Sequence, residues 1–182
     1  IKDIIKKKKI GKLKIIKSNF SQDFRSLRKD YKKIYYSNMN ESGGIVFDAL
    51  SHHINLLAYY GGKIKKIIKS EMKLVFTDIN VNDTALILIN FKNNILVNVF
   101  GNQFQKPNVD EIEFIGTKNN LIFDRTKNQL FLVNRNKTLI KSFDETYGDL
   151  FSNQMKNFLG CLKKRSQPKT TLLEELENLG KL

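Results

Sequence analysis

The sequence predicts an α+β fold with one open, mostly antiparallel sheet and helices packed on one of its faces. An apolar helical segment spans residues 43–62, residues 63–143 alternate with period two, and two amphipathic segments close the chain. A strand run flanked by helices, rather than alternating with them, is typical of an α+β layer. We therefore expect one sheet face to remain free of helices.

The first part of the chain contains helix and strand signals separated by glycines. Residues 25–41 are polar and aromatic, and a connection of this length inside a domain is usually functional or disordered. We expect a first helix with Ile1, Ile4 and Ile5 on one side, which ends at Gly11, and then a strand over 13–24. After the connection we expect a second helix, which begins at Gly43-Gly44 and ends at Gly61-Gly62.

The second part favours strands and then two helices. Residues 84–91 and 95–104 form an expected hairpin around 92–94. Thr171 and Glu174 have the spacing of a helix capping box. We expect strands at 63–76, 84–91, 95–104, 111–115, 121–124, 129–133 and 138–143, then helices over 151–162 and after Pro168.

Composition narrows the class of protein. The chain has 182 residues, of which 41% are hydrophobic and 27% charged, as in a globular domain. No apolar run reaches the roughly 18 residues of a membrane span. The single cysteine, Cys161, excludes an internal disulfide and a cysteine zinc cluster, and no metal is expected. We expect Cys161 to be a buried thiol on the apolar side of its helix, and the protein to be cytoplasmic.

The net charge of +14 does not by itself indicate a nucleic-acid partner. The lysines are spread over many elements and mostly alternate with isoleucine, as on the solvated faces of strands and helices. The aromatic stacking positions and recognised modules of nucleic-acid binders are not evident. We therefore expect no nucleic-acid partner and no membrane.

Three polar residues interrupt the apolar helix at 43–62. Asp48, His52 and Asn55 fall at i, i+4 and i+7 and share one stripe. An aspartate one turn from a histidine can fix its tautomer and raise its basicity, as a general base near neutral pH requires. The alternative is that Asp48 caps the first turn and His52 is a satisfied core histidine.

The connection before this helix carries candidate ligands. Arg25, Arg28 and Lys29 form either a solvated charged loop or a carboxylate or phosphate site. Tyr31, Tyr35 and Tyr36 either pack the loop down or stack on a sugar. Gly43-Gly44 is either a plain turn or a close approach for an anion at the helix N-terminus.

Several motifs in a fixed order resemble one family. They are Gly11-Lys12-Leu13, Ser42-Gly43-Gly44-x-x-x-Asp48-x-x-x-His52-x-x-Asn55-Leu56-Leu57 with Gly61-Gly62, Asp83-Thr84-Ala85, and Ile115-Gly116-Thr117-Lys118 before Leu121 to Asp124. Together they resemble the C-terminal domain of the glucose–fructose oxidoreductase / inositol dehydrogenase / rhizopine-catabolism (Gfo/Idh/MocA) family. Arg28, Tyr31, Tyr35 and the Ser51-His52 pair look closest to members that act on sugars in surface-carbohydrate pathways.

The resemblance implies half of an active site. Family members are NAD(P)-dependent oxidoreductases whose N-terminal Rossmann domain carries a glycine-rich loop and a Glu-Lys-Pro motif with a catalytic lysine; neither motif occurs here. Asp48 and His52 would bind substrate hydroxyls and relay the proton. Arg28, Tyr35 and Asn55 are the substrate-binding candidates, although many members have aspartate where Asn55 stands. NAD or NADP would be bound mainly by the absent domain, and none is expected on this chain alone.

We therefore expect residues 1–182 to be a single substrate-binding and oligomerisation domain from the C-terminal part of a longer protein. Its expected partners are a sugar or polyol substrate, its own Rossmann domain, and further copies of itself through the open sheet face. The alternative is a non-catalytic sheet domain that binds a ligand or a partner.

Overall fold

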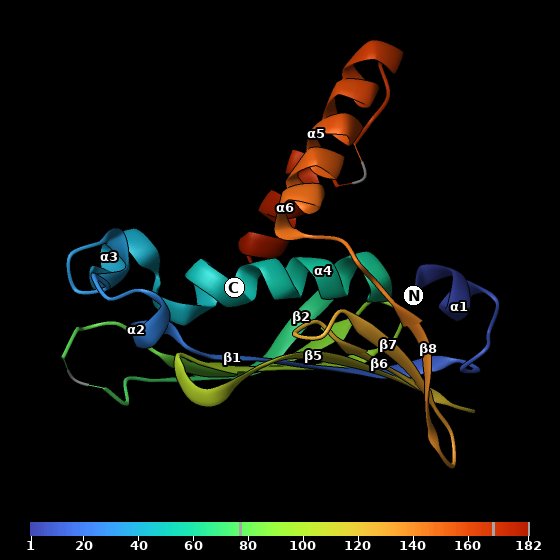
Figure 1. Cartoon of the computed structure of the whole chain (residues 1–182), viewed down its shortest axis with the longest axis horizontal. Coiled ribbons are helices and arrows are strands. Elements are labelled where there is room, and N and C mark those ends of the chain that lie inside the picture. The colour runs from blue at the N-terminus through green and yellow to red at the C-terminus, as the bar shows by residue number, and fades with distance from the viewer. Residues whose placement is uncertain (77, 169, 182) are drawn as a thin grey trace.

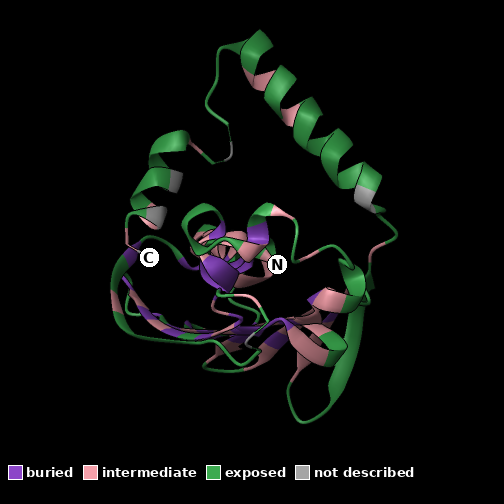
Figure 2. Ribbon diagram, turned by 90° about the vertical axis from the view of Figure 1, so that its left-hand side faces the viewer, coloured by how far each residue is buried: buried purple, intermediate pink, exposed green. Residues whose placement is uncertain are grey.

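An eight-stranded sheet forms the base of the molecule, and the helices lie on one side of it (Figure 1, Figure 2). The computed structural model describes residues 1–76, 78–168 and 170–181. The expected α+β class, with an open and mostly antiparallel sheet, is confirmed. The strands are β1 Leu13–Asp23, β2 Ile64–Lys73, β3 Thr84–Phe91, β4 Leu96–Asn102, β5 Phe104–Gly116, β6 Asn120–Asp124, β7 Gln129–Val133 and β8 Lys137–Ser142.

The helices follow the expected order, with additional short turns in the connection. They are α1 Lys2–Lys6, α2 Phe24–Leu27, α3 Met39–Ser42, α4 Ser51–Gly61, α5 Tyr147–Lys164 and α6 Leu172–Leu179, with a 3₁₀ turn at Tyr35–Ser37 and a π-helical turn at Val46–Leu50. None of the helices in the described ranges has both the length and the apolar character that crossing a membrane requires.

The sheet is ordered β2-β3-β4-β1-β5-β6-β7-β8. Strand β1 pairs parallel with β4, while every other neighbouring pair is antiparallel. The first strand therefore lies at the centre of the sheet, between strands that come much later in the chain. Residues from β1, β4 and β5 are consequently neighbours beneath α4.

The core lies between α4 and the sheet (Figure 2). Ile16, Val97 and Phe114 point to the helix side of the sheet and are fully buried, as period-two alternation requires. Gly101 allows the π-helical turn before α4 to approach the sheet closely, because a Cβ there would lie 2.8 Å from the Leu50 side chain and 2.6 Å from the Phe20 carbonyl oxygen of the neighbouring strand. The helix is thus seated directly on the central strands.

The connection over 25–41 is more structured than expected. Residues 24–42, here called the flap, contain α2, the 3₁₀ turn and α3. A second small core of Phe24, Tyr36 and Val81 packs the flap against the loop that follows β2. Tyrosines within the connection supply the apolar contacts that keep it folded.

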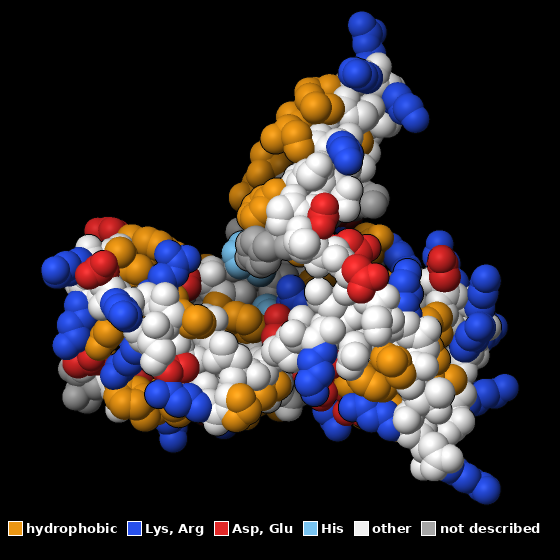
Figure 3. All heavy atoms as spheres, in the orientation of Figure 1, with side chains coloured by type: hydrophobic (Ala, Val, Ile, Leu, Met, Phe, Trp, Pro, Cys, Tyr) orange, Lys and Arg blue, Asp and Glu red, His pale blue; other side chains and the backbone are white. Residues whose placement is uncertain are grey.

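Helix α5 rises away from the sheet, and hydrophobic side chains run along one side of it (Figure 3). Phe151, Met155 and Phe158 are all more than half exposed. The expected burial of Cys161 is wrong: its thiol is only half buried and donates to the Gln167 carbonyl oxygen at 3.5 Å. The physical reason is that this part of α5 stands clear of the sheet.

Candidate active site

Helix α4 and the π-helical turn before it have an apolar face that packs on the sheet and a polar face on the other side. Val46, Leu50, Ile54 and Leu57 are buried against the sheet. Asp48 and Asn55 are half buried, and His52 is exposed. The polar stripe predicted from the sequence therefore lies away from the sheet, and His52 is not a core histidine.

The turn that carries Asp48 is π-helical rather than α-helical. The Ser51 N–H bonds to the Val46 carbonyl oxygen, five residues back. The Ser51 hydroxyl donates to the Phe47 carbonyl oxygen at 2.7 Å, the acceptor that an α-helix would pair with the Ser51 N–H. Single π-helical turns within helices are frequent at functional sites. This widened turn sets the direction of Asp48 relative to the rest of the helix.

The glycine pair before this turn acts as a tight turn. Gly43 and Gly44 both have positive φ, at 62° and 64°. A Cβ on Gly44 would lie 2.8 Å from the Asn82 carbonyl oxygen, and the Ile45 N–H donates to that same oxygen at 2.9 Å. One of the N–H groups that could meet an anion at this helix start is therefore already used.

Tyr35, from the flap, contacts Asp48. Its hydroxyl donates a hydrogen bond to the Asp48 carboxylate, and this bond is the main reason that the pKa of Tyr35 is raised. The structure thus gives Asp48 a partner on the flap, where the sequence pattern suggested His52. Two of the predicted site residues, thirteen positions apart, meet at this point.

The other polar residues of the flap hold it in place. Arg25 forms an ion pair with Asp78 at 2.6 Å and lies over the Phe76 ring at 3.8 Å. Tyr31 also donates to Asp78. Arg28 is exposed and its charge acts on Tyr35. Of the charged candidates, Arg25 is therefore structural and Arg28 remains next to the site.

The second histidine of the pair, His53, was missed by the sequence analysis. It is buried on the sheet side of α4, where its Nδ1 lies 3.1 Å from the Ser18 hydroxyl and its Nε2 3.2 Å from Arg125 Nη1. Adjacent histidines on a helix cannot share a face, and the apolar residues at 50, 54 and 57 indicate that position 53 faces the sheet. The spacing of these apolar residues in the sequence could therefore have predicted that His53 is buried.

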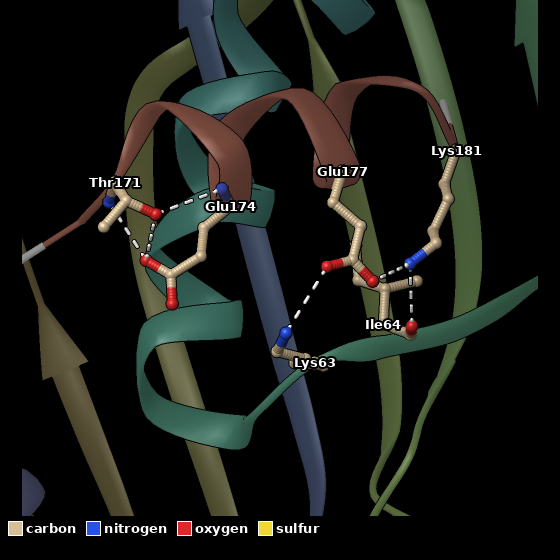
Figure 4. A network of polar contacts seen from close by, with 6 residues as sticks. All are labelled: Lys63, Ile64, Thr171, Glu174, Glu177 and Lys181. Atoms are coloured by element: carbon tan, nitrogen blue, oxygen red, sulfur yellow. Dashed lines mark hydrogen bonds and ion pairs between the residues drawn. The ribbon is translucent and has the colours of Figure 1, made fainter.

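Asn55 lies farther along α4, beside α6. A pocket of about 210 Å³ separates the two helices, lined by Asn55, Tyr59, Glu174, Glu177 and their neighbours. Figure 4 shows Glu177 of α6 and Lys181, just after that helix, above the start of β2. The Lys63 ammonium lies 3.5 Å from the Glu177 carboxylate, and Lys181 donates to the Ile64 carbonyl oxygen. The same view shows the predicted capping box of Thr171 and Glu174, which is confirmed.

Metal-ligand clusters and dinucleotide-binding loops each have a recognisable pattern of residues. The described ranges contain no group of three or more His, Cys, Asp or Glu residues placed to hold a metal ion. The sequence has no Gly-x-Gly-x-x-Gly loop after a strand. Of the predicted site residues, Tyr35 contacts Asp48 and the charge of Arg28 acts on Tyr35, while His52 lies exposed one turn farther along.

The chain is similar to known proteins both in sequence and in fold. Residues 1–122 match the model for the GFO/IDH/MocA C-terminal domain. The chain superposes on a putative NADPH-dependent oxidoreductase from Desulfitobacterium hafniense DCB-2 with a TM-score of 0.84 and 17% identity, covering 99% of this chain and 55% of that one. No curated protein matches by sequence.

Two further solved structures share the fold. Levoglucosan dehydrogenase in complex with NADH and levoglucosan has a TM-score of 0.81 and 13% identity, with 97% of this chain and 55% of that chain covered. UDP-N-acetylglucosamine 3-dehydrogenase GnnA from Acidithiobacillus ferrooxidans has a TM-score of 0.74 and 11% identity, with 98% and 54% covered. The chain spans about 55% of the length of these structures.

Proposed function

The chain belongs to the GFO/IDH/MocA family through its C-terminal domain, and we propose that it is the substrate-binding half of an NAD(P)-dependent sugar or polyol dehydrogenase. The polar stripe on α4 carries this proposal. Asp48 and His52 belong to the motif by which the sequence resembles the family, and neither is buried against the sheet: Asp48 is half buried on the π-helical turn, and His52 is exposed at the start of α4. The hydrogen bond that Tyr35 donates to Asp48 supports a site here, because it brings together two candidate residues from separate segments.

The proposed chemistry divides between two domains. The nicotinamide cofactor, held mainly by an N-terminal domain, supplies the hydride acceptor. On this chain, His52 accepts the proton that the substrate hydroxyl loses, and Asp48 binds that hydroxyl and keeps it oriented. Tyr35 holds Asp48 from the flap, while Arg28 and Asn55 contact the rest of the substrate.

The open sheet face supports oligomerisation as part of the same proposal. Leu86 and Leu96 point away from the helices and are both about two-fifths exposed. Leu86 lies directly opposite Phe100 on β4. Apolar residues in neighbouring strands of an uncovered face are typical of a protein–protein contact. We propose that this face meets the same face of a second copy.

The full-length protein provides the test. We expect it to reduce NAD⁺ or NADP⁺ in the presence of one member of a panel of sugars and polyols that includes levoglucosan, followed by nicotinamide absorbance. The coding sequence before Ile1 should contain a Gly-x-Gly-x-x-Gly loop and a Glu-Lys-Pro motif. An intact gene without either would contradict the dehydrogenase proposal.

The second candidate is a non-catalytic sheet domain that binds a partner. The exposed apolar residues of the open face favour it, because they would serve an interface whether or not the α4 stripe is catalytic. Substitution of His52 separates the two functions. A non-catalytic domain would keep all of its measurable binding in the His52→Ala variant.

A further inference from the structure

A buried polar cluster lies beneath α4, on the side opposite the candidate active site. It consists of Ser18 from β1, His53 from α4, Asp110 from β5, and Arg125 from the turn between β6 and β7. His53 is 4% exposed, and the Phe20 ring packs on its imidazole with ring centroids 4.6 Å apart. None of these side chains has a role in the chemistry proposed above.

The contacts of His53 determine its tautomer. A guanidinium group has only donors, so His53 Nε2, 3.2 Å from Arg125 Nη1, must be the acceptor. A ring that accepts at Nε2 carries its proton on Nδ1, which therefore donates to the Ser18 hydroxyl oxygen at 3.1 Å. Both ring nitrogens are thus hydrogen-bonded, Nδ1 to strand β1 and Nε2 to the turn between β6 and β7.

The surroundings of His53 also keep it neutral. Burial is the main cause that lowers its pKa to about 3, and the positive charge of Arg125 adds to the effect. The ionisable groups that face it are Arg125 and Asp110, whose Oδ1 lies 3.8 Å from Nε2, with His52 beside it on α4. Asp110 also forms an ion pair with Arg125 at 3.2 Å, so the guanidinium is held between the carboxylate and the imidazole.

We propose that His53 is a positioning residue: as the neutral Nδ1–H tautomer it holds the start of α4, which carries His52, and the adjoining π-helical turn, which carries Asp48, in place over β1 and β5. His53 follows His52 directly, and its two partners belong to the sheet and the β6–β7 turn. A rotation or shift of this part of α4 would break both contacts and move the polar stripe with it. The catalytic consequence rests on the proposed function, whereas the tautomer and the anchoring do not.

Nitrogen-15 NMR of the full-length protein tests the tautomer. This chain has two histidines, so a His52→Gln variant assigns its two rings. Long-range proton–nitrogen spectra should show His53 protonated at Nδ1 and bare at Nε2, without change between about pH 5 and 8. A proton on Nε2, or a His53 ring that becomes protonated in this range, would overturn the proposal.

Two matched substitutions test the positioning. The carbonyl oxygen of Gln in His53→Gln can reach the place of Nε2 and accept from Arg125, whereas the amide of Asn in His53→Asn reaches only the place of Nδ1. We expect kcat to fall between about 10-fold and 10²-fold in His53→Asn, with the KM for the nicotinamide nucleotide unchanged, and to fall much less in His53→Gln. Circular dichroism at the assay temperature must show both variants folded.

Amide hydrogen exchange supplies a readout that does not depend on catalysis. Residues 46–53 should exchange faster in His53→Asn than in His53→Gln, while α6 is unaffected. Equal exchange and equal kcat in the two variants would overturn the positioning role. A wild-type protein that oxidises no sugar in the panel would contradict the proposed function instead, and the NMR and exchange results would still decide the role of His53.

Discussion

The hydroxyl group of Tyr35 donates a hydrogen bond to the carboxylate of Asp48, and this contact joins the flap to the π-helical turn before α4. Tyr35 is 56% exposed, so the bond is formed at the surface. It directs one of the carboxylate oxygens toward the flap and leaves the other available. The flap is therefore part of the candidate site rather than a remote connection.

Removing the Tyr35 hydroxyl should reduce substrate binding and turnover together. In Tyr35→Phe we expect kcat/KM for the sugar to fall about 10-fold, because a hydrogen bond to a charged group contributes roughly 1.5–3 kcal/mol. Tyr31→Phe is the matched control, since the Tyr31 hydroxyl bonds to Asp78 in the loop that follows β2 and not to Asp48. Equal losses in the two variants would show that only the folding of the flap matters.

Substitution of the catalytic candidates should separate the roles of the two residues. In the full-length protein, His52→Ala should lower kcat by roughly 10²-fold or more, the typical contribution of a general base. Asp48→Asn should lower it less, because the amide keeps the shape of the carboxylate. Fluorescence titration should find the nicotinamide nucleotide affinity nearly unchanged in both. Wild-type turnover by His52→Ala would rule out the proton-relay role.

The stability of the protein should fall as the pH is lowered below 6.5. The folded-state pKa of His53 is lowered from its ordinary value of 6.5 to about 3, so in this range the unfolded chain binds a proton that the folded chain does not. The free energy of unfolding should therefore decrease by about 2 kcal/mol between pH 6.5 and 5 from this group.

Urea unfolding at both pH values measures this loss. Burial raises the pKa of the Asp110 carboxyl, so at low pH the folded chain binds a proton there more readily than the unfolded chain does. This group therefore increases the free energy of unfolding as the pH falls, which opposes the effect of His53. His53→Gln removes the titrating ring and should flatten the dependence between pH 6.5 and 5. The same slope in the variant and the wild type would assign the acid sensitivity to another group.

The open face of the sheet should determine the oligomeric state. Leu86, 40% exposed and opposite Phe100, lies on the side away from the helices. Leu86→Glu would place a charge in the proposed contact and should convert the full-length protein to monomers in light scattering. Leu173→Glu, on α6 at a residue 78% exposed, is the control for an added charge elsewhere. A monomeric wild type would contradict the proposed interface.

Residues 1–182 alone should not bind NAD or NADP measurably. The sequence lacks the glycine-rich turn whose backbone N–H groups bind a pyrophosphate. Titration calorimetry of the isolated chain with each nucleotide checks this. Binding in the micromolar range would show that this chain carries a nucleotide site of its own.

The sequence by itself determined the class of the fold and most of its strands. Period-two alternation in segments such as 84–91 and 111–115 reports burial on one face of a sheet, which is a local property of the chain. The i, i+4 and i+7 spacing of Asp48, His52 and Asn55 predicted that they lie off the apolar face, and none of the three is buried. The π-helical turn that carries Asp48 was not predictable from this spacing. These patterns do not depend on which distant segment covers them.

Only the tertiary structure decided the partners of these residues. Asp48 meets Tyr35 because the flap folds back over the π-helical turn, and His53 meets Ser18 and Arg125 because β1 is inserted between β4 and β5. Cys161 is only half buried and the apolar side of α5 is exposed because that helix leaves the sheet. The periodicity of a segment shows which of its faces is apolar and which is polar. Which atoms contact that face depends on how distant strands and loops pair, and the local sequence does not contain this information.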